Sequence, residues 1–180
     1  RELAEEGYLV RVVGVGSFVA ESKIEVHPLE VRNIADEIRG RGHDYTARVE
    51  LLAEERANAR LAQNLSLEAG AIVFHSVIVH FENDMPIQLE DRYVNPAIAP
   101  GYLEQDYSLQ TPNEYLSAAA PIQEVEHIVE AVMPPSQVGH LLHMQPGEPC
   151  LLISRRTWAN GLVASGARLY HPGATYRLGG

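Results

Sequence analysis

Two histidines, a carboxylate and a hydroxyl lie in segments whose pattern is typical of β-strands. His80 and Glu90 stand on either side of the turn-forming residues ENDM, and Ser165 and His171 follow an Asn-Gly pair. Every second side chain of a strand points to the same face of its sheet. Taken singly, each of these polar residues is more often structural than functional. If the four converge on one face, they form a cluster suited to binding a small molecule.

The turn of the first hairpin decides whether His80 meets Glu90. Period two places His80 on one face of the first long strand, together with Ile72, Phe74, Ser76 and Ile78. A three-residue turn from Glu82 to Asp84 brings Glu90 to that face, whereas a two-residue turn places it on the opposite face. Both alternatives are open from the sequence.

The second hairpin carries a clearer signal. Asn160 and Gly161 between two apolar runs predict a two-residue turn. Strict alternation from that turn places Ser165 and His171 on one face together with Leu152, Ser154 and Arg156.

Motifs of catalytic centres are missing from the sequence. There is no G-x-S-x-G elbow, P-loop or G-x-G-x-x-G loop, since Gly14 and Gly16 lack a third glycine. His140 and His143 lie three residues apart, but no further metal-ligand pattern accompanies them. Cys150 opens an apolar strand, which is typical of a buried structural thiol. We therefore expect no enzyme, no catalytic residue, no metal and no cofactor.

The elements that must position the polar residues alternate between short helices and strands. We expect a helix that starts at Thr111 with Pro112 and Glu114, because this spacing is that of a capping box. Further helices are expected at 28–39, 57–65 and 135–144, and strands at 46–55, 71–81, 86–94, 122–133, 150–158 and 162–173. This pattern predicts an α+β domain with a mainly antiparallel six-stranded sheet.

Composition narrows the class of protein. A hydrophobic share of 46% and a charged share of 21% are those of a globular protein. The net charge of −10 repels nucleic acid. No run approaches the ~18 apolar residues of a membrane span, so we expect no membrane partner. A single cysteine is most simply explained by a reducing cytoplasm.

The segment HFENDMPIQLEDRYVNP resembles the signature strand pair of GntR-family regulators that carry a UTRA effector-binding domain. Pro86, Leu89, Glu90, Tyr93 and Pro96 stand in family positions. VEHIVEAV, PGEPCLLISRRTW and the terminal YRL are similar as well. The resemblance implies the fold of chorismate lyase and a UTRA domain over residues 31–180.

The first residues resemble the end of a GntR-type winged helix-turn-helix. RELAEEG is similar to the tail of a recognition helix, and YLVRVVGVGSFVAE to a two-stranded wing. The resemblance implies a DNA-binding remnant over residues 1–21, with Arg11, Gly14 and Gly16 in the wing, and a linker over 22–30. On this interpretation the rest of the DNA-binding domain precedes Arg1, and operator DNA is a partner of the full-length protein only.

The resemblance also implies a mechanism. UTRA domains of homodimeric repressors bind an effector without turning it over, and thereby relieve DNA binding. Here it implies control of histidine-utilisation genes by urocanate or a close imidazole acid. The alternatives are a chorismate lyase-type enzyme, or a sensor of a different small carboxylate or sugar.

Site residues carried over from the family fall into two groups. A carboxylate would lie at a helix N-terminus beside Arg32 and Asn33, where free N–H groups favour an anion. Glu90 would accept an imidazole N–H. Two arginines of sugar-phosphate sensors are replaced here by Ile78 and His80. The remaining family positions are Thr111, Asn113, Ser165 and His171.

Overall fold

The computed structural model describes residues 9–12, 16–19 and 33–177. The chain divides into two units, which we treat separately: Arg1–Leu29 and Glu30–Gly179. In the first, β1 (Leu9–Val12) pairs antiparallel with β2 (Gly16–Val19). Arg11 pairs with Ser17, and Gly16 pairs with Val12. Gly14 and Arg32 lie outside the described residues, so their expected roles stay predictions.

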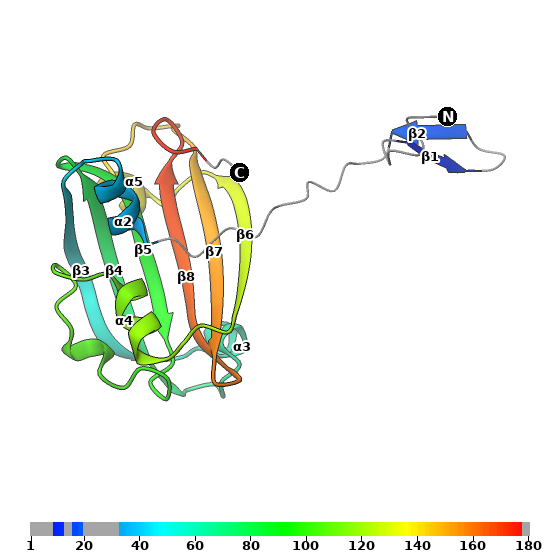
Figure 1. Ribbon diagram of the computed structural model, residues 1–180. Helices are drawn as coiled ribbons and strands as arrows, with labels where there is room; N and C mark the ends of the chain where they lie inside the picture. Colours follow the sequence, from blue (N-terminus) through cyan, green and yellow to red (C-terminus); the bar gives the residue numbers. More distant parts are fainter. Residues whose placement is uncertain (1–8, 13–15, 20–32, 178–180) are drawn as a thin grey trace. The chain divides into compact units, whose positions relative to one another are not determined.

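The second unit is built on one antiparallel sheet (Figure 1). Its six strands have the order β3-β4-β5-β8-β7-β6. Their bounds are β3 Tyr45–Arg56, β4 Ile72–Glu82, β5 Met85–Val94, β6 Glu124–Val132, β7 Cys150–Ala159 and β8 Leu162–Pro172. The predicted α+β class with a six-stranded antiparallel sheet is confirmed.

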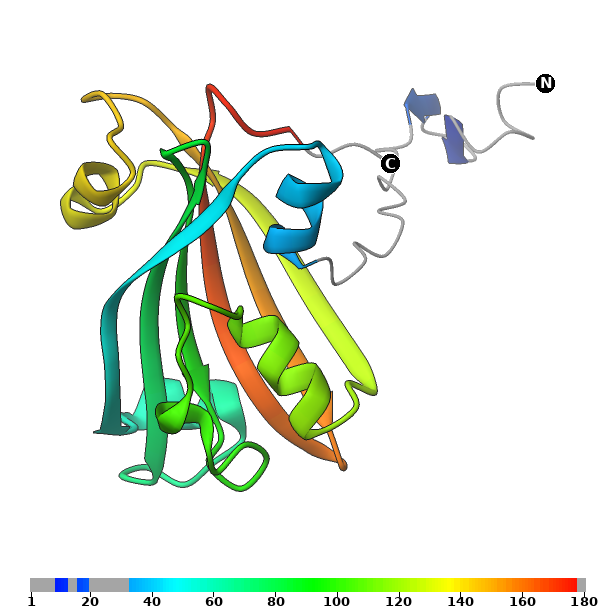
Figure 2. The same ribbon diagram turned by 60° about the vertical axis from the view of Figure 1, so that its left-hand side comes forward.

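Short helices cover both faces of the sheet (Figures 1 and 2). Leu116 of α4 and Tyr102 of η1 pack on Ile78 of one face. Leu142, just after α5, packs on Leu89 of the other face, and α3 packs there on Val73. The helices are α2 Ile34–Gly40, α3 Ala59–Leu65, η1 Tyr102–Glu104, α4 Pro112–Ala119 and α5 Ser136–Leu141. No helix of the described part has the length and apolar character needed to cross a bilayer.

Capping side chains set the start of two helices. The capping box predicted at Thr111 and Glu114 is present at the start of α4. The helix expected over 28–39 instead begins at Ile34, because Asn33 is extended (φ −79°, ψ 122°) and its side chain accepts from the Ala35 N–H. Residues 28–32 of that prediction lie outside the described part of the chain.

A β-bulge in the first hairpin decides the face of Glu90. The turn has two residues, Asn83 and Asp84, both with positive φ, and Glu82 pairs with Met85. Such a turn alone would separate His80 from Glu90. However, the register shifts between His80 and Phe81, so that His80 pairs with Gln88 and Ile78 with Glu90. The extra residue of the bulge therefore returns Glu90 to the face of His80.

A second bulge overturns the face predicted for Ser165 and His171. The two-residue turn is confirmed: Ala159 pairs with Leu162, and Gly161 has φ +73°. The register then shifts between Thr157 and Trp158, so Ser165 pairs with Thr157 and His171 with Leu151. The two residues therefore lie on the face of Thr157, Arg155 and Ile153. The prediction that Ser165 and His171 share a face with Leu152, Ser154 and Arg156 was wrong, because one extra residue inverts the alternation.

Candidate functional site

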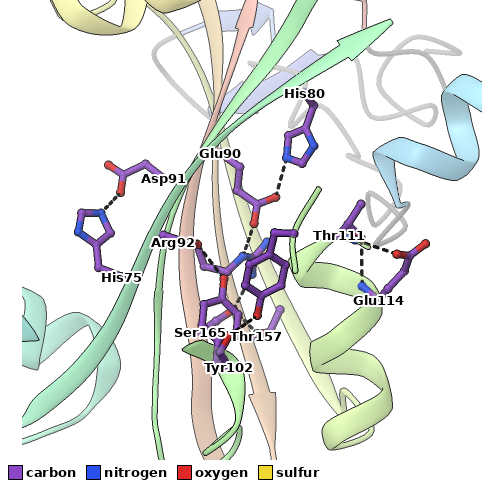
Figure 3. Close-up of polar contacts among 12 residues, drawn as sticks. His75, His80, Glu90, Asp91, Arg92, Tyr102, Thr111, Glu114, Thr157 and Ser165 are labelled. Atoms are coloured by element: carbon purple, nitrogen blue, oxygen red, sulfur yellow. Dashed lines mark hydrogen bonds and ion pairs between the residues drawn. The ribbon is translucent and has the colours of Figure 1, made fainter. Parts of the chain in front are cut away.

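Glu90 is the centre of a buried polar cluster on the sheet face that α2 and α4 cover (Figure 3). Arg92 donates from Nε to Glu90 Oε1 at 2.5 Å, and His80 Nε2 lies 3.5 Å from Oε2. Burial alone would raise the pKa of Glu90. The charge of Arg92 and the interaction with His80 outweigh that effect and lower the pKa to about 2. Glu90 is thus a carboxylate at neutral pH, with Arg92 as its counter-charge.

A chain of hydrogen bonds extends from Arg92 across β8 to β7 (Figure 3). Arg92 Nη1 donates to Ser165 Oγ at 2.8 Å, and Ser165 Oγ lies 2.9 Å from Thr157 Oγ1. Ser76 shares a 2.7 Å hydrogen bond with the Tyr102 hydroxyl. Ser165 is therefore brought into the Glu90 cluster, where it positions Arg92.

The two predicted histidines lie in one row across the sheet. His80 Nδ1 shares a 2.9 Å hydrogen bond with the Tyr45 hydroxyl, and Gln88 Nε2 donates to His171 Nε2 at 2.7 Å. Burial, aided by nearby positive charge, lowers the pKa of His171 to about 4, so this ring is neutral at pH 7. Among the described residues, His171 Nδ1 is buried without a hydrogen-bond partner, and the buried His80 Nε2 has only its long 3.5 Å ion-pair contact with Glu90. Buried polar atoms of this kind are rare and indicate a place for a ligand or water.

Asn33 and Thr111 join α2 to α4. The Thr111 hydroxyl donates to Asn33 Oδ1 at 3.0 Å, and Asn33 Nδ2 donates to Glu114 Oε1 at 2.7 Å. Both side chains are thereby satisfied and buried. Asn113 is half-buried in the first turn of α4. The structure thus brings Asn33 and Thr111 together as a clamp between two helices, beside the sheet face but apart from the Glu90 cluster.

The opposite face carries a separate ionic group. His75 lies between Glu55 (2.7 Å) and Asp91 (2.9 Å) and stacks on Tyr93. Burial disfavours the charged imidazole, but the two carboxylates outweigh it and raise the pKa of His75. Both ring nitrogens are used, so this group stabilises the sheet. The described residues hold no cluster of three or more His, Cys, Asp or Glu placed to bind a metal ion.

Several residues of the cluster were not singled out from the sequence. Arg92 and Gln88 lie two residues from Glu90 on the same strand, so period two was a sufficient signal for them. Thr157 and Arg155 reach this face only because of the bulge in β7–β8, which no sequence signal announced. Together the side chains offer one matched ion pair, unsatisfied imidazole nitrogens and apolar neighbours, an arrangement that suits binding rather than bond cleavage.

Comparison with known proteins gives consistent matches. Residues 40–177 match the UTRA domain family. A histidine utilization repressor of Pseudomonas putida is 53% identical over 180 residues, which cover 100% of this chain and 73% of that protein. The crystal structure of the C-terminal domain of a histidine utilization repressor from Pseudomonas syringae pv. tomato str. DC3000 matches with a TM-score of 0.74 and 51% identity, covering 76% of this chain and 97% of that one. PhnF from Mycobacterium smegmatis matches with a TM-score of 0.76, covering 98% of this chain and 79% of that one; at 21% identity it supports the fold alone.

Proposed function

This chain belongs to the UTRA domain family, and we propose that its six-stranded unit senses urocanate or a close imidazole acid. The resemblance to UTRA-carrying regulators is thereby confirmed. The curated relatives at 52–53% identity are named histidine utilization repressors, and the chain accordingly carries the effector domain of a transcriptional repressor. The identity of the effector that this domain binds is the part that we propose.

The observation that supports an imidazole acid is the row of His80, Gln88 and His171. Gln88 donates to His171 Nε2, so the neutral His171 carries its proton on Nδ1. This buried N–H makes no hydrogen bond of normal geometry among the described residues, although the backbone groups of Leu151 and Leu169 lie near the ring. An imidazole ring has both a donor and an acceptor nitrogen, and it complements such a row. The family resemblance implies that sugar-phosphate sensors carry arginines at the positions of Ile78 and His80. In this chain, Ile78 is packed in an apolar cluster. This arrangement favours an effector of lower charge than a sugar phosphate.

The regulatory step follows from differential binding. An effector shifts the repressor towards a state with low DNA affinity only if it binds that state more tightly. We propose that this occurs in a homodimer, and that operator DNA is the second partner. The clamp of Asn33 and Thr111 supports such coupling, because Asn33 stands near the start of the six-stranded unit in the sequence.

Thermal unfolding of the chain with candidate effectors tests the proposal. A ligand at a hundred times its Kd adds about 2.7 kcal/mol to the stability of the folded state, which raises Tm by roughly 5–10 °C for a domain of this size. We expect that rise with urocanate and not with glucosamine 6-phosphate or chorismate. A rise only with another ligand would reassign the effector within the UTRA family. Consumption of chorismate, followed by absorbance, would instead indicate a lyase.

A further inference from the structure

Arg155 of β7 is a buried arginine whose charge is not matched. Its exposed fraction is 9%, and its Nε donates to His127 Nε2 at 2.7 Å. No acidic side chain of the described residues forms an ion pair with it. Arg92, its buried neighbour on the same face, is by contrast paired with Glu90. Burying a charge without a partner is costly, so such a residue calls for an explanation.

At neutral pH no charged partner among the described residues is in direct contact with Arg155. Burial and then the charge of Arg92 lower the pKa of Arg155 to about 10, so it still carries a proton at pH 7. Burial, followed by the charge of Arg155, lowers the pKa of His127 to about 4. The partner is therefore a neutral imidazole that accepts one hydrogen bond and contributes no charge. Glu90 and Glu37 favour the charge of Arg155 from a distance, but neither forms an ion pair with it.

Between Arg155 and His171 lies an apolar platform, formed by Ile153, Ala167 and Leu169. Tyr176 packs against this platform and stacks on His171, with ring centroids 3.8 Å apart and planes 21° from parallel. The platform therefore accepts a planar ring, in the place that the Tyr176 side chain takes here. Arg155 lies four residues along β7 from Leu151, the partner of His171, or about 13 Å at the usual rise of a strand. The two side chains reach towards one another, since the charge of Arg155 contributes to the lowered pKa of His171.

We propose that Arg155 binds the carboxylate of the effector, whose planar part extends over the platform towards His171. This inference rests on the proposed function and names the group that holds the acid end. A guanidinium suits this role because it pairs with a carboxylate through two parallel hydrogen bonds. The carboxylate is thereby assigned to β7 and not to the N-terminus of α2, where the hydrogen bonds of Asn33 already serve the helix cap.

Calorimetry with urocanate and its methyl ester distinguishes an ion pair between Arg155 and the carboxylate from a packing effect of the Arg155 side chain. We expect Arg155→Met to weaken urocanate binding at least tenfold and to change binding of the uncharged ester less than twofold. Arg156→Met is the matched control, because Arg156 lies on the opposite face and pairs with Glu126. It should leave both affinities within twofold. Equal losses for acid and ester in Arg155→Met, or no loss for either, would overturn the assignment.

Two further measurements keep the inference testable if urocanate is not the effector. Thermal shifts with planar carboxylates that lack an imidazole, such as cinnamate, and with the matching amides should show an acid-specific rise that Arg155→Met abolishes. That result would support Arg155 as the carboxylate-binding residue even if urocanate is not the effector. If no carboxylate gives a rise in Tm that depends on Arg155, the proposed role of Arg155 is refuted. Without ligand, Arg155→Met should melt at or above the wild-type temperature, and a clearly lower Tm would make Arg155 a structural residue.

Discussion

Replacing Glu90 with Gln removes one negative charge from between Arg92 and His80. The native environment lowers the pKa of Glu90 from its ordinary value of 4.5 to about 2. Each pKa unit between the folded and unfolded states corresponds to about 1.4 kcal/mol, so the ionised carboxylate contributes about 3 kcal/mol to the free energy of unfolding at pH 7. Because the folded pKa is depressed, this contribution is complete above pH 4.5 and is lost as the pH falls towards 2. Glu90→Gln should therefore cost about 3 kcal/mol at pH 7.

Urea unfolding followed by circular dichroism, from pH 7 down to the acid limit of the fold, measures this difference. Glu50→Gln is the control, because Glu50 pairs with Arg48 at the surface, and such pairs contribute about 0–1 kcal/mol. The double variant Glu90→Leu/Arg92→Met removes both charges. It should recover most of the lost stability, since apolar replacement of a buried pair is often neutral.

Two outcomes would refute this reasoning. A loss below 1 kcal/mol for Glu90→Gln at pH 7 would mean that the pair with Arg92 hardly exceeds its desolvation cost. A double variant no more stable than Glu90→Gln would assign the loss to packing and not to the unpaired charge of Arg92.

Three further predictions concern stability. His171 stays neutral in the fold down to about pH 4, so wild-type stability should decline between pH 6.5 and 4 more steeply than that of His171→Gln in urea titrations. The raised pKa of His75 gives stability that is complete below pH 6.5 and is lost as pH rises through the folded pKa; the advantage of wild type over His75→Gln should therefore shrink in alkali, and a constant gap would contradict it. Asn33→Ala should cost about 1–2 kcal/mol through loss of the cap, whereas Asn113→Ala should stay within about 0.5 kcal/mol by the same assay.

Local chemistry in the sequence was sufficient to predict much of the architecture. The capping box at Thr111 and the Asn-Gly turn at 160–161 are formed by neighbouring residues, and the structure has both. Period two grouped Ser76, Ile78 and His80 on one face because nothing interrupts β4 between them. Signals of this kind act within a few residues, so they can be evaluated before the chain is folded.

The tertiary structure decided which residues of neighbouring strands share a face of the sheet. One extra residue in β5 brings Glu90 to His80, and one in β8 moves Ser165 and His171 to the side of Arg155. A bulge inverts alternation beyond it, and its position depends on packing and pairing across the whole sheet. Likewise, the burial of Arg155 beside His127 depends on the pairing of β7 with β6. The sequence by itself determined the elements and their turns, whereas the charges and hydrogen bonds of the site exist only once the strands are paired.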